Sequence, residues 1–223
     1  MPEPGSPHTL RLAAPLFLAS ASPRREAILR RAGFRFTVAP APHAEEAQAR
    51  GGTAPETVAR ALAVQKAAAA ARHHPDAFVL GADTVVALGG VLLGKPADAS
   101  EAGAMLRRLS GRAHAVVTGV AVAGPDGVLS GAKTTIVRFR RYSDREIETY
   151  VLTGSPMDKA GAYGIQDRDF APAAAATGCY LNVVGLPLCL TVDLLLEAGA
   201  LREAPGRPPR CLASLAGPAF PAA

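Results

Sequence analysis

The sequence Phe-Val-Leu-Gly-Ala-Asp-Thr at residues 78–84 points to an α/β protein with a polar site at its sheet. Its first five residues form a short apolar run, which is typical of a buried strand. The run stops at Asp83, and Asp is a poor strand residue, so a carboxylate here needs a reason. Because α/β sheets bind ligands outside their strand ends, Asp83 is a candidate to ligate Mg²⁺ or to accept a proton from water. A turn-forming Asp ahead of a hairpin explains the residue about as well.

Short apolar strands alternate with amphipathic helices on both sides of this stretch, which indicates an α/β fold. Strands are expected at residues 16–19, 34–38, 78–82, 84–88, 91–93, 115–123 and 128–139. Helices are expected after Ser22 as N-cap, after capping boxes at residues 53–56 and 143–146, and at residues 100–109 and 187–198. The pair Gly89-Gly90 predicts a hairpin between two of the strands.

Length and composition fit one compact domain or one two-lobed unit, because the chain has 223 residues. Hydrophobic residues make up 49% and aromatic residues only 5%, so the core must be aliphatic. Residues 1–14 and 200–223 are rich in Pro, Ala and Gly and show no periodicity. We therefore expect two poorly ordered tails around a domain of residues 15–199.

Cysteine usage and charge narrow the class of protein. Cys179, Cys189 and Cys211 are too far apart for a zinc knuckle, and their odd number argues against a disulfide framework. We see neither an apolar leader nor an apolar run of ~18 residues, so we expect a cytoplasmic protein that does not associate with membranes. The formal charge of +5 is compatible with nucleic-acid binding. No long basic stripe is interleaved with aromatic residues, however, so we expect a small polyanionic partner and no nucleic acid.

Two basic segments are candidates for holding phosphate. Residues 20–25 read Ser-Ala-Ser-Pro-Arg-Arg, and they place hydroxyl and guanidinium donors at a helix start that favours an anion. An ordinary N-cap with solvent-facing arginines is about equally consistent. Lys95 stands between Gly94 and Pro96, where a restricted backbone suits a positioned phosphate contact. The Walker A spacing is absent, and a solvated loop lysine is the ordinary alternative.

Other polar residues also have both a functional and an ordinary explanation. The segment Asp158–Gln166 has two glycines that allow close backbone approach, and the amide of Gln166 can read the edge of a nucleobase. A glycine-rich turn with a surface Gln is the alternative. Glu45 and Glu46 lie in an expected loop, either as metal ligands or as a solvated pair. Lys66 lies within an expected helix, where an exposed lysine is the default.

Seven segments, in this order, resemble the Maf family of nucleotide pyrophosphatases. They are residues 18–25 (Leu-Ala-Ser-Ala-Ser-Pro-Arg-Arg), the helix around Lys66, residues 80–86 (Leu-Gly-Ala-Asp-Thr-Val-Val), 94–98 (Gly-Lys-Pro-Ala-Asp), 109–112 (Leu-Ser-Gly-Arg), 158–166 (Asp-Lys-Ala-Gly-Ala-Tyr-Gly-Ile-Gln) and 182–188 (Asn-Val-Val-Gly-Leu-Pro-Leu). Each segment alone is weak, but seven in register are specific. They run from about residue 16 to residue 199, which is nearly the whole expected domain.

The resemblance implies a mixed twisted sheet of the Maf/ITPase-like kind, with flanking helices and two lobes around a cleft, usually in a homodimer. It also implies hydrolysis of a nucleoside triphosphate to a monophosphate and pyrophosphate, with Mg²⁺ or Mn²⁺ as cofactor. By position, Asp83 would accept a proton from the attacking water. Glu45 would help Asp83 to hold the metal.

The same resemblance assigns the substrate contacts. The residues at phosphate-binding positions are Ser22, Arg24, Lys66 and Lys95. The residues at the specificity positions of the subfamily acting on dTTP and UTP are Arg24, Thr84 and Gln166. In that subfamily reading, Gln166 pairs with the N3–H and O4 edge of uracil or thymine.

Two segments depart from the family pattern. Where the family usually carries an acidic Asp-x-Asp-Glu-like stretch, residues 42–46 read Pro-His-Ala-Glu-Glu, so either Glu45 or Glu46 is the expected metal ligand. Residues 167–178 are rich in Ala and Pro and lack the usual hydrophobic strand with an acidic end. We expect this wall of the cleft to be rebuilt, with Asp167 or Asp169 as the substitute.

Three functions remain open on the sequence. The first is a dTTP/UTP pyrophosphatase, which would also act on modified pyrimidine nucleotides. The second is the same chemistry on 7-methyl-GTP or another modified nucleotide. The third is a nucleotide-binding regulator with little turnover, such as an inhibitor of septum formation in cell division.

Overall fold

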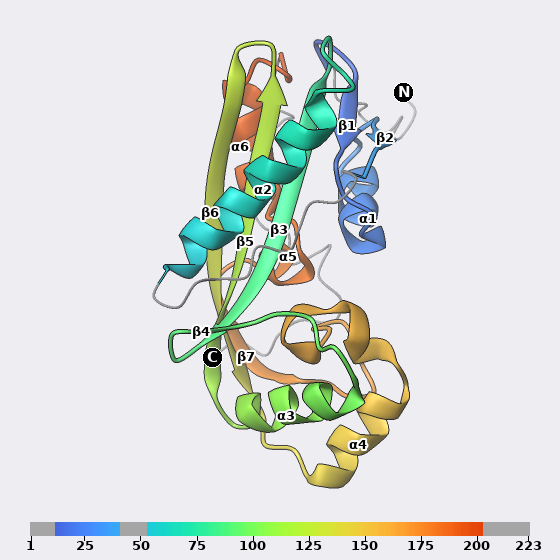
Figure 1. Ribbon diagram of the computed structural model, residues 1–223, viewed down its shortest axis with the longest axis vertical. Helices are drawn as coiled ribbons and strands as arrows, with labels where there is room; N and C mark the ends of the chain where they lie inside the picture. Colours follow the sequence, from blue (N-terminus) through green and yellow to red (C-terminus); the bar gives the residue numbers. More distant parts are fainter. Residues whose placement is uncertain (1–11, 41–52, 203–223) are drawn as a thin grey trace, which may run out of the picture.

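A seven-stranded mixed sheet forms the centre of the computed structural model, which describes residues 12–40 and 53–202 (Figure 1). The strand order is β2-β1-β3-β5-β6-β7, and β4 pairs with β3 outside this path. The mutually parallel strands are β1 (Leu16–Leu18), β2 (Thr37–Val38) and β3 (Phe78–Leu88). The strands with antiparallel pairing are β4 (Val91–Leu93), β5 (Ala113–Gly124), β6 (Gly127–Phe139) and β7 (Ala173–Thr177). The expected mixed α/β fold is confirmed.

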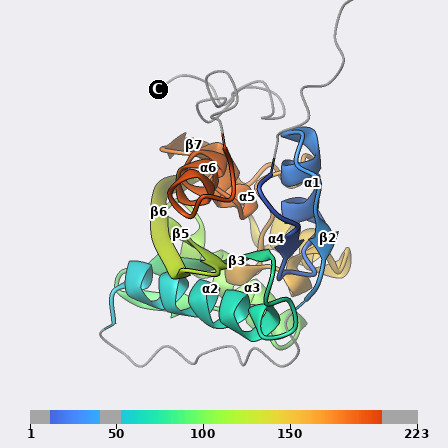
Figure 2. The same cartoon turned by 90° about the horizontal axis from the view of Figure 1, so that it is seen from above.

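Helices cover both faces of the sheet in the first lobe. The long helix α2 (Pro55–Ala71) lies on one face (Figure 2). On the other face lie α1 (Pro23–Arg31), α5 (Tyr180–Val184) and α6 (Leu188–Glu197). An aliphatic core fills the space between this second group and the sheet, as the composition predicts.

Helix α2 lies close to the sheet because two glycines face it. A Cβ atom on Gly81 would lie 2.4 Å from the carbonyl oxygen of Ala63, and one on Gly119 would lie 2.1 Å from that of Ala59. The helix meets these glycines with alanines, among which Ala59, Ala63 and Ala67 are fully buried. Only glycine leaves room for the helix backbone here, so this contact sets the distance between α2 and the central strands β3 and β5.

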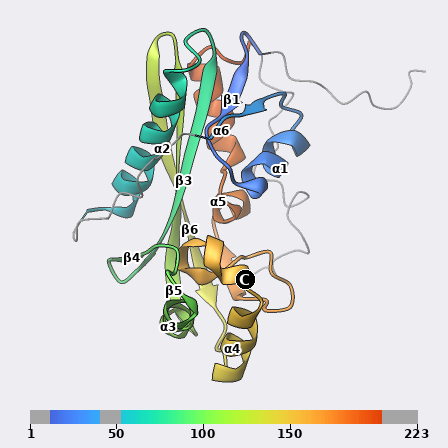
Figure 3. The same cartoon turned by 45° about the vertical axis from the view of Figure 1, so that its right-hand side comes forward.

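The far halves of β3, β5 and β6 continue into a second lobe (Figure 3). This lobe also contains α3 (Ala99–Leu109), α4 (Asp144–Leu152) and the short 3-10 helices η1 (Ser155–Asp158) and η2 (Ala160–Ala162). Its separate apolar core includes Leu106, Phe139 and Ile147. The expected two lobes are therefore present, and continuous strands join them.

A histidine is buried in the core of the second lobe. His114 is 3% exposed, and its Nε2 atom lies 2.9 Å from the hydroxyl of Tyr163. The Nδ1 atom has no hydrogen-bond partner in the described residues. Burial lowers the pKa of His114 to about 4, although the Arg112 backbone acts in the opposite direction. The side chain is therefore neutral at physiological pH.

Two helix starts follow the predicted chemistry. Ser143 and Glu146 form the expected capping box at α4, and their side chains each accept a backbone N–H from the other's residue. Helix α3 begins one residue earlier than predicted, because the Asp98 carboxylate caps it by accepting the N–H of Glu101 at 2.8 Å. The hairpin at Gly89-Gly90 joins β3 and β4 as expected.

Two local predictions are wrong, and one strand was not predicted. The capping box at residues 53–56 does not form, because Ala54 is the N-cap and Pro55 takes the first helical position. Glu56 instead accepts a hydrogen bond from the Thr134 hydroxyl at 2.7 Å. The expected strand at residues 34–38 shrinks to β2. Residues 173–177 do form a strand, β7, because pairing with β6 uses the backbone and tolerates alanine side chains.

Both expected tails lie mostly outside the described residues. Their inner ends join the fold: Leu12 forms an isolated antiparallel bridge with Leu201, and the N–H of Ala13 donates to the carbonyl of Ala200 at 2.9 Å. Leu201 is 3% exposed and belongs to the core of the first lobe. Across residues 12–40 and 53–202, no helix combines the length and apolar character needed to cross a membrane.

Candidate active site

A cleft of about 1060 Å³ lies beside an interruption in the pairing of β3. Strand β1 pairs with residues 78–80 of β3 and β4 pairs with residues 86–88, so no described strand pairs with residues 81–85 on this edge. On the opposite edge, the ladder to β5 is continuous from residue 79 to residue 87. Because β1 is short, the turn that follows it, at residues 19–22, enters this space and starts α1 beside the cleft.

Asp83 lies in the middle of β3, which corrects the expectation that it follows a strand end. The strand continues because the backbone of Asp83 remains in the ladder, opposite Gly119 of β5. Strand alternation puts Gly81 and Asp83 on the face of α2, where the Lys66 ammonium forms an ion pair with Asp83 Oδ1. Both side chains are mostly buried, with 23% of Lys66 and 15% of Asp83 exposed. The close packing of α2 therefore positions this ion pair.

Arg25 is a cleft residue that the sequence-based assignment passed over in favour of Arg24. It is 9% exposed, and its guanidinium donates three hydrogen bonds: Nε to the carbonyl of Gly185 at 2.8 Å, Nη1 to Ser20 Oγ at 2.9 Å and Nη2 to Thr84 Oγ1 at 3.1 Å. Burial lowers the pKa of Arg25, whereas the nearby charge of Asp83 raises it. Since all three acceptors are uncharged, the guanidinium retains a positive charge that an anion in the cleft would neutralise.

The hydrogen bonds of Thr84 fix the direction of its hydroxyl proton. Thr118 Oγ1 donates its proton to the carbonyl of Asn182 at 2.8 Å, so it must accept in its 2.9 Å contact with Thr84 Oγ1. Thr84 therefore donates to Thr118 and accepts from Arg25. A substrate group that contacts this hydroxyl from the cleft must be a hydrogen-bond donor.

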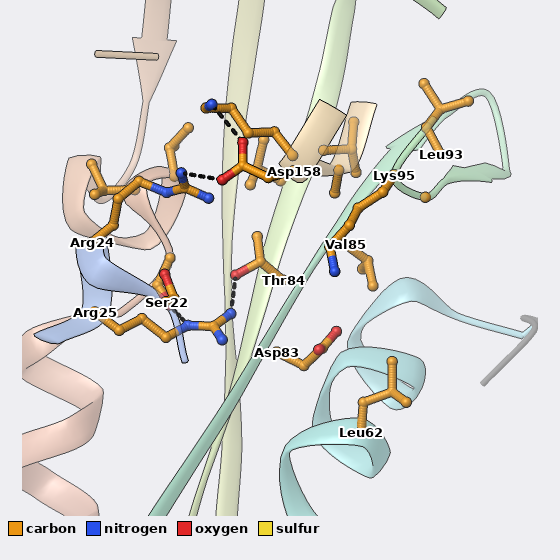
Figure 4. A pocket seen from close by; sticks show the side chains of 18 of the residues that line it. Ser22, Arg24, Arg25, Leu62, Asp83, Thr84, Val85, Leu93, Lys95 and Asp158 are labelled. Carbon is orange, nitrogen blue, oxygen red and sulfur yellow. Dashed lines mark hydrogen bonds and ion pairs between the residues drawn. The ribbon is translucent and has the colours of Figure 1, made fainter. Parts of the chain in front are cut away.

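Ser22 and Arg24 reach the cleft from the start of α1. Ser22 is the N-cap by position, as predicted, but its side chain makes no capping hydrogen bond. Arg24 Nη1 forms an ion pair at 3.2 Å with Asp158 Oδ2 of η1 (Figure 4). Lys159 binds the other oxygen of Asp158 at 2.7 Å. Burial acts to raise the pKa of Asp158, but Lys159 and Arg24 outweigh it and lower that pKa.

Lys95 and Gln166 complete the predicted set. Lys95 extends into the cleft from the loop after β4, opposite Arg25, and Figure 4 shows its side chain reaching toward Asp83. That loop is tied to η2, because the N–H of Gly161 donates to the carbonyl of Gly94 at 2.9 Å. Gln166 is exposed at the rim. The cleft thus brings together seven of the eight predicted residues: Ser22, Arg24, Lys66, Asp83, Thr84, Lys95 and Gln166.

The eighth residue, Glu45, lies outside the described residues, as does its neighbour Glu46. In the part of the chain that is described, no three His, Cys, Asp or Glu side chains gather as a metal site. Asp83 is the carboxylate at the centre of the cleft, and Asp158 and Asp167 are on its lining. Mg²⁺ usually binds one or two carboxylates together with substrate phosphates and water. The donors present fit that mode of binding.

Asp167 and Asp169, the two candidates to replace the acidic strand end, differ in position: Asp167 lines the cleft and Asp169 does not. Asp167 accepts hydrogen bonds from the hydroxyls of Tyr150 and Ser155, the second at 3.0 Å, so it braces the turn that carries Gln166 against α4. Asp169 is exposed and stands outside the set of residues that line the cleft. The wall at residues 167–178 is formed by β7 and this braced turn.

Comparison with known proteins identifies a matching family and several similar proteins. The family described as Maf-like protein matches residues 15–198. The chain is 51% identical over 184 residues to the dTTP/UTP pyrophosphatase of Symbiobacterium thermophilum, covering 82% of this chain and 94% of that protein. It is 48% identical over 199 residues to the dTTP/UTP pyrophosphatase of Thermomicrobium roseum, covering 88% and 91%. A nucleoside-triphosphatase (dITP/XTP pyrophosphatase) from Mycobacterium abscessus aligns in structure over 57% of this chain and 75% of that one, with a TM-score of 0.39 and 19% identity.

Proposed function

The chain belongs to the Maf family, and from this premise we propose that it hydrolyses dTTP and UTP to the monophosphate and pyrophosphate. Relatives whose names state this activity support the proposal, at 51% and 48% identity and over more than nine tenths of their own length. The structural observation that carries it is the cleft itself. There, the Asp83 carboxylate lies among the cationic side chains of Arg25, Lys66 and Lys95.

The proposed reaction is an in-line displacement at the α-phosphorus. The oxygen of a water molecule bonds to the α-phosphorus as the bond to the α,β-bridging oxygen breaks, and pyrophosphate leaves with the bonding electrons. Asp83 orients the water and accepts its proton. Lys66, Lys95 and Arg25 bind the phosphate oxygens and stabilise the charge that develops on the leaving group. Ser22 adds a hydroxyl at the positive end of α1.

We propose Mg²⁺ or Mn²⁺ as the cofactor. Asp83 would hold it, with Glu45 or Glu46 as the second carboxylate. When bound, such an ion offsets the negative charge of the triphosphate and makes pyrophosphate a better leaving group.

We propose that Gln166 reads the pyrimidine. Its amide can pair with the N3–H and O4 edge of uracil or thymine, and a site that leaves the sugar hydroxyl difference unread would let dTTP and UTP both react. Arg24 and Thr84 would complete the recognition, Thr84 as an acceptor. We also propose modified pyrimidine nucleotides as substrates. Their hydrolysis would remove them from the nucleotide pool of the cell.

We further propose a homodimer that acts in the cytoplasm, where nucleoside triphosphates are made and used. Size-exclusion chromatography with light scattering tests the dimer, and the mass of a single chain at all concentrations would contradict it. Fractionation of cells that express the tagged protein tests the location.

The deciding experiment is a nucleotide panel. Purified protein with Mg²⁺ is given dTTP, UTP, CTP, GTP and 7-methyl-GTP, and pyrophosphate release is measured for each. We expect the highest kcat/KM on dTTP and UTP, and a loss of about 10²–10⁴-fold in Asp83→Asn. The matched control is Asp144→Asn, which changes an exposed carboxylate of α4 that pairs with Arg107 of α3.

Each alternative has its own result in this panel. A higher kcat/KM on 7-methyl-GTP than on dTTP and UTP would refute the proposed pyrimidine specificity. Nucleotide binding without pyrophosphate release, across several metals, would favour the regulator over the enzyme. Full activity in Asp83→Asn would refute the role given to that carboxylate.

A further inference from the structure

Two fully buried polar residues, Thr118 of β5 and Asn182 of α5, lie behind the wall of the cleft. Neither of them lines the cleft, although Thr84 and Val183 beside them do. Polar side chains that are shut away from water are costly unless their donors and acceptors are paired. The hydrogen bonds of Thr118 and Asn182 therefore indicate what this position requires.

Asn182 binds the strands of the sheet through its whole side chain. Its Oδ1 accepts the backbone N–H of Thr118 at 3.1 Å, and its Nδ2 donates to the carbonyl of Val116 at 2.9 Å. Nδ2 also donates to Thr135 Oγ1 of β6 at 2.9 Å. The carbonyl of Asn182 accepts the Thr118 hydroxyl at 2.8 Å. One residue thus fixes Thr118 both at its backbone and at its side chain.

Thr118 carries this constraint to the cleft through Thr84. Its hydroxyl gives its proton to Asn182 and accepts that of Thr84 at 2.9 Å. The Thr84 proton is thereby turned away from Arg25, whose Nη2 donates to Thr84 Oγ1 at 3.1 Å. Nε of the same guanidinium donates to the carbonyl of Gly185, at the end of α5, at 2.8 Å. A series of hydrogen bonds therefore runs from the core to a charged group in the cleft.

The guanidinium of Arg25 has two further N–H groups for a ligand. Of its five N–H donors, three are taken by acceptors in the described part of the chain, namely Ser20, Thr84 and Gly185. The remaining two are on Nη1 and Nη2, at the end of the side chain that points toward Asp83 in Figure 4. Hydrogen bonds from a guanidinium to phosphate oxygens depend on direction, so the contacts that orient Arg25 also set its fit to a phosphate.

We propose that Thr118 is a positioning residue for this anion site, with Asn182 as its anchor in the core. The inference rests on the proposed function for its ligand, the phosphate chain of a nucleoside triphosphate. Thr118 acts only through Thr84, because it is fully buried outside the cleft. Without the acceptor on Thr118, the Thr84 hydroxyl turns freely and no longer holds Arg25 Nη2 in one direction.

The test variant is Thr118→Val, which replaces the hydroxyl with a methyl group of similar size. A methyl group cannot approach Thr84 Oγ1 to 2.9 Å, so Thr84 must also move by roughly 0.5 Å. Thr118→Ser restores the hydroxyl, and Thr118→Ala removes it without adding a methyl group. The matched control is Thr191→Val on α6, since Thr191 is also fully buried and its hydroxyl donates to the carbonyl of Pro187 at 3.1 Å.

Calorimetry with Mg²⁺ gives Kd for the non-hydrolysable α,β-methylene analogues of UTP and GTP, and pyrophosphate release gives kcat/KM for UTP. We expect Kd to rise about fivefold in Thr118→Val and in Thr118→Ala, as the loss of one hydrogen bond implies. The factor should be the same for every analogue that the wild type binds, because the phosphates are common to both. The kcat/KM for UTP should fall by at least this factor. Thr118→Ser and Thr191→Val should stay within about twofold of the wild type.

A double-mutant cycle with Arg25→Ala shows whether Thr118 acts through Arg25. In the Arg25→Ala background, Thr118→Val should change Kd by less than about twofold. A fivefold rise in that background would overturn the proposal, and so would an unchanged Kd in both Thr118→Val and Thr118→Ala. An equal rise in Thr191→Val would overturn it as well, because the effect would then be a general one of the core.

The proposed function can fail separately from this inference. If the wild type releases no pyrophosphate but binds an analogue, the proposed function is wrong, and the Kd values still decide the role of Thr118. If the wild type binds neither analogue, Arg25 does not belong to an anion site and the inference is overturned.

Discussion

Gly119→Ala adds one methyl group at the contact between β5 and α2. The new Cβ would lie 2.1 Å from the carbonyl oxygen of Ala59 and 2.6 Å from the backbone nitrogen of Arg60. Ordinary contacts begin near 3.4 Å, so the helix must move outward by roughly 1.3 Å. These are backbone atoms, which cannot rotate away as the end of a side chain can. The alanine face of α2 therefore loses contact with the sheet as a unit.

The expected loss of unfolding free energy is about 3 kcal/mol, at the upper end of the usual cost of overpacking. The rate of pyrophosphate release should fall by more than the loss of unfolding free energy alone would cause. Lys66 is on the displaced helix, and Asp83 is directly opposite Gly119 in the ladder, so the ion pair between them would be pulled apart. A misplacement on the order of 1 Å can cost ~10²-fold in rate, and we expect a similar loss of pyrophosphate release.

Urea unfolding followed by far-ultraviolet circular dichroism measures the stability, since the chain has no Trp to report by fluorescence. Gly103→Ala on α3 is the matched control. Its Cβ would meet only the flexible end of Arg107 at 3.2 Å and a methyl group of Ile147 at 4.0 Å, so a gain of up to ~1 kcal/mol is expected from helix propensity. If Gly119→Ala unfolds within about 0.5 kcal/mol of the wild type, the close-packing argument is wrong.

Three further predictions follow from buried groups and from the proposed metal. Arg25→Lys should lower the unfolding free energy by about 2 kcal/mol, because one ammonium cannot replace three directed guanidinium bonds; the exposed Arg30→Lys should change it by less than about 0.5 kcal/mol. The pKa of His114 is about 4 when folded and 6.5 otherwise, so folding favours the neutral form, and stability should decline by up to roughly 3 kcal/mol as pH falls from 6.5 to 4. Urea midpoints between pH 7 and pH 4.5 measure this slope, and His114→Gln should flatten it. Chelation with EDTA should abolish pyrophosphate release and added Mg²⁺ should restore it, whereas full activity in EDTA would contradict a metal cofactor.

The sequence was most informative where chemistry is local. The capping box at Ser143 and the hairpin at Gly89-Gly90 form as predicted, because their hydrogen bonds and backbone conformations depend on a few neighbouring residues. At residues 53–56 the same pattern failed, since Pro55 takes the first helical position and shifts the cap to Ala54. A local pattern is decisive only when no neighbour competes for the same position.

Long-range packing decided the rest of the site. Asp83 looked like a strand end because a carboxylate is unusual within a strand, but the ladder to β5 carries β3 through it. Arg25 had a detectable signal: it lies three and four residues before Ile28 and Leu29 and shares the buried face of α1 with both, whereas Arg24 has such a spacing only to Ile28. The ion pair between Arg24 and Asp158 joins the two lobes and two residues far apart in the chain, so no local pattern predicts it.

The interruption in the pairing of β3 also bears on how the protein avoids aggregation. Backbone groups on an open strand edge can recruit a strand from another molecule, and residues 81–85 form such an edge among the described strands. This edge is only five residues long, it is flanked by β1 and β4, and Lys66 and Lys95 line the space in front of it. Short length and charged lysines both discourage strand addition. The residues that would bind a triphosphate thus also keep foreign peptide out of the cleft, and a variant stripped of these charges would lose colloidal stability along with affinity for nucleotide.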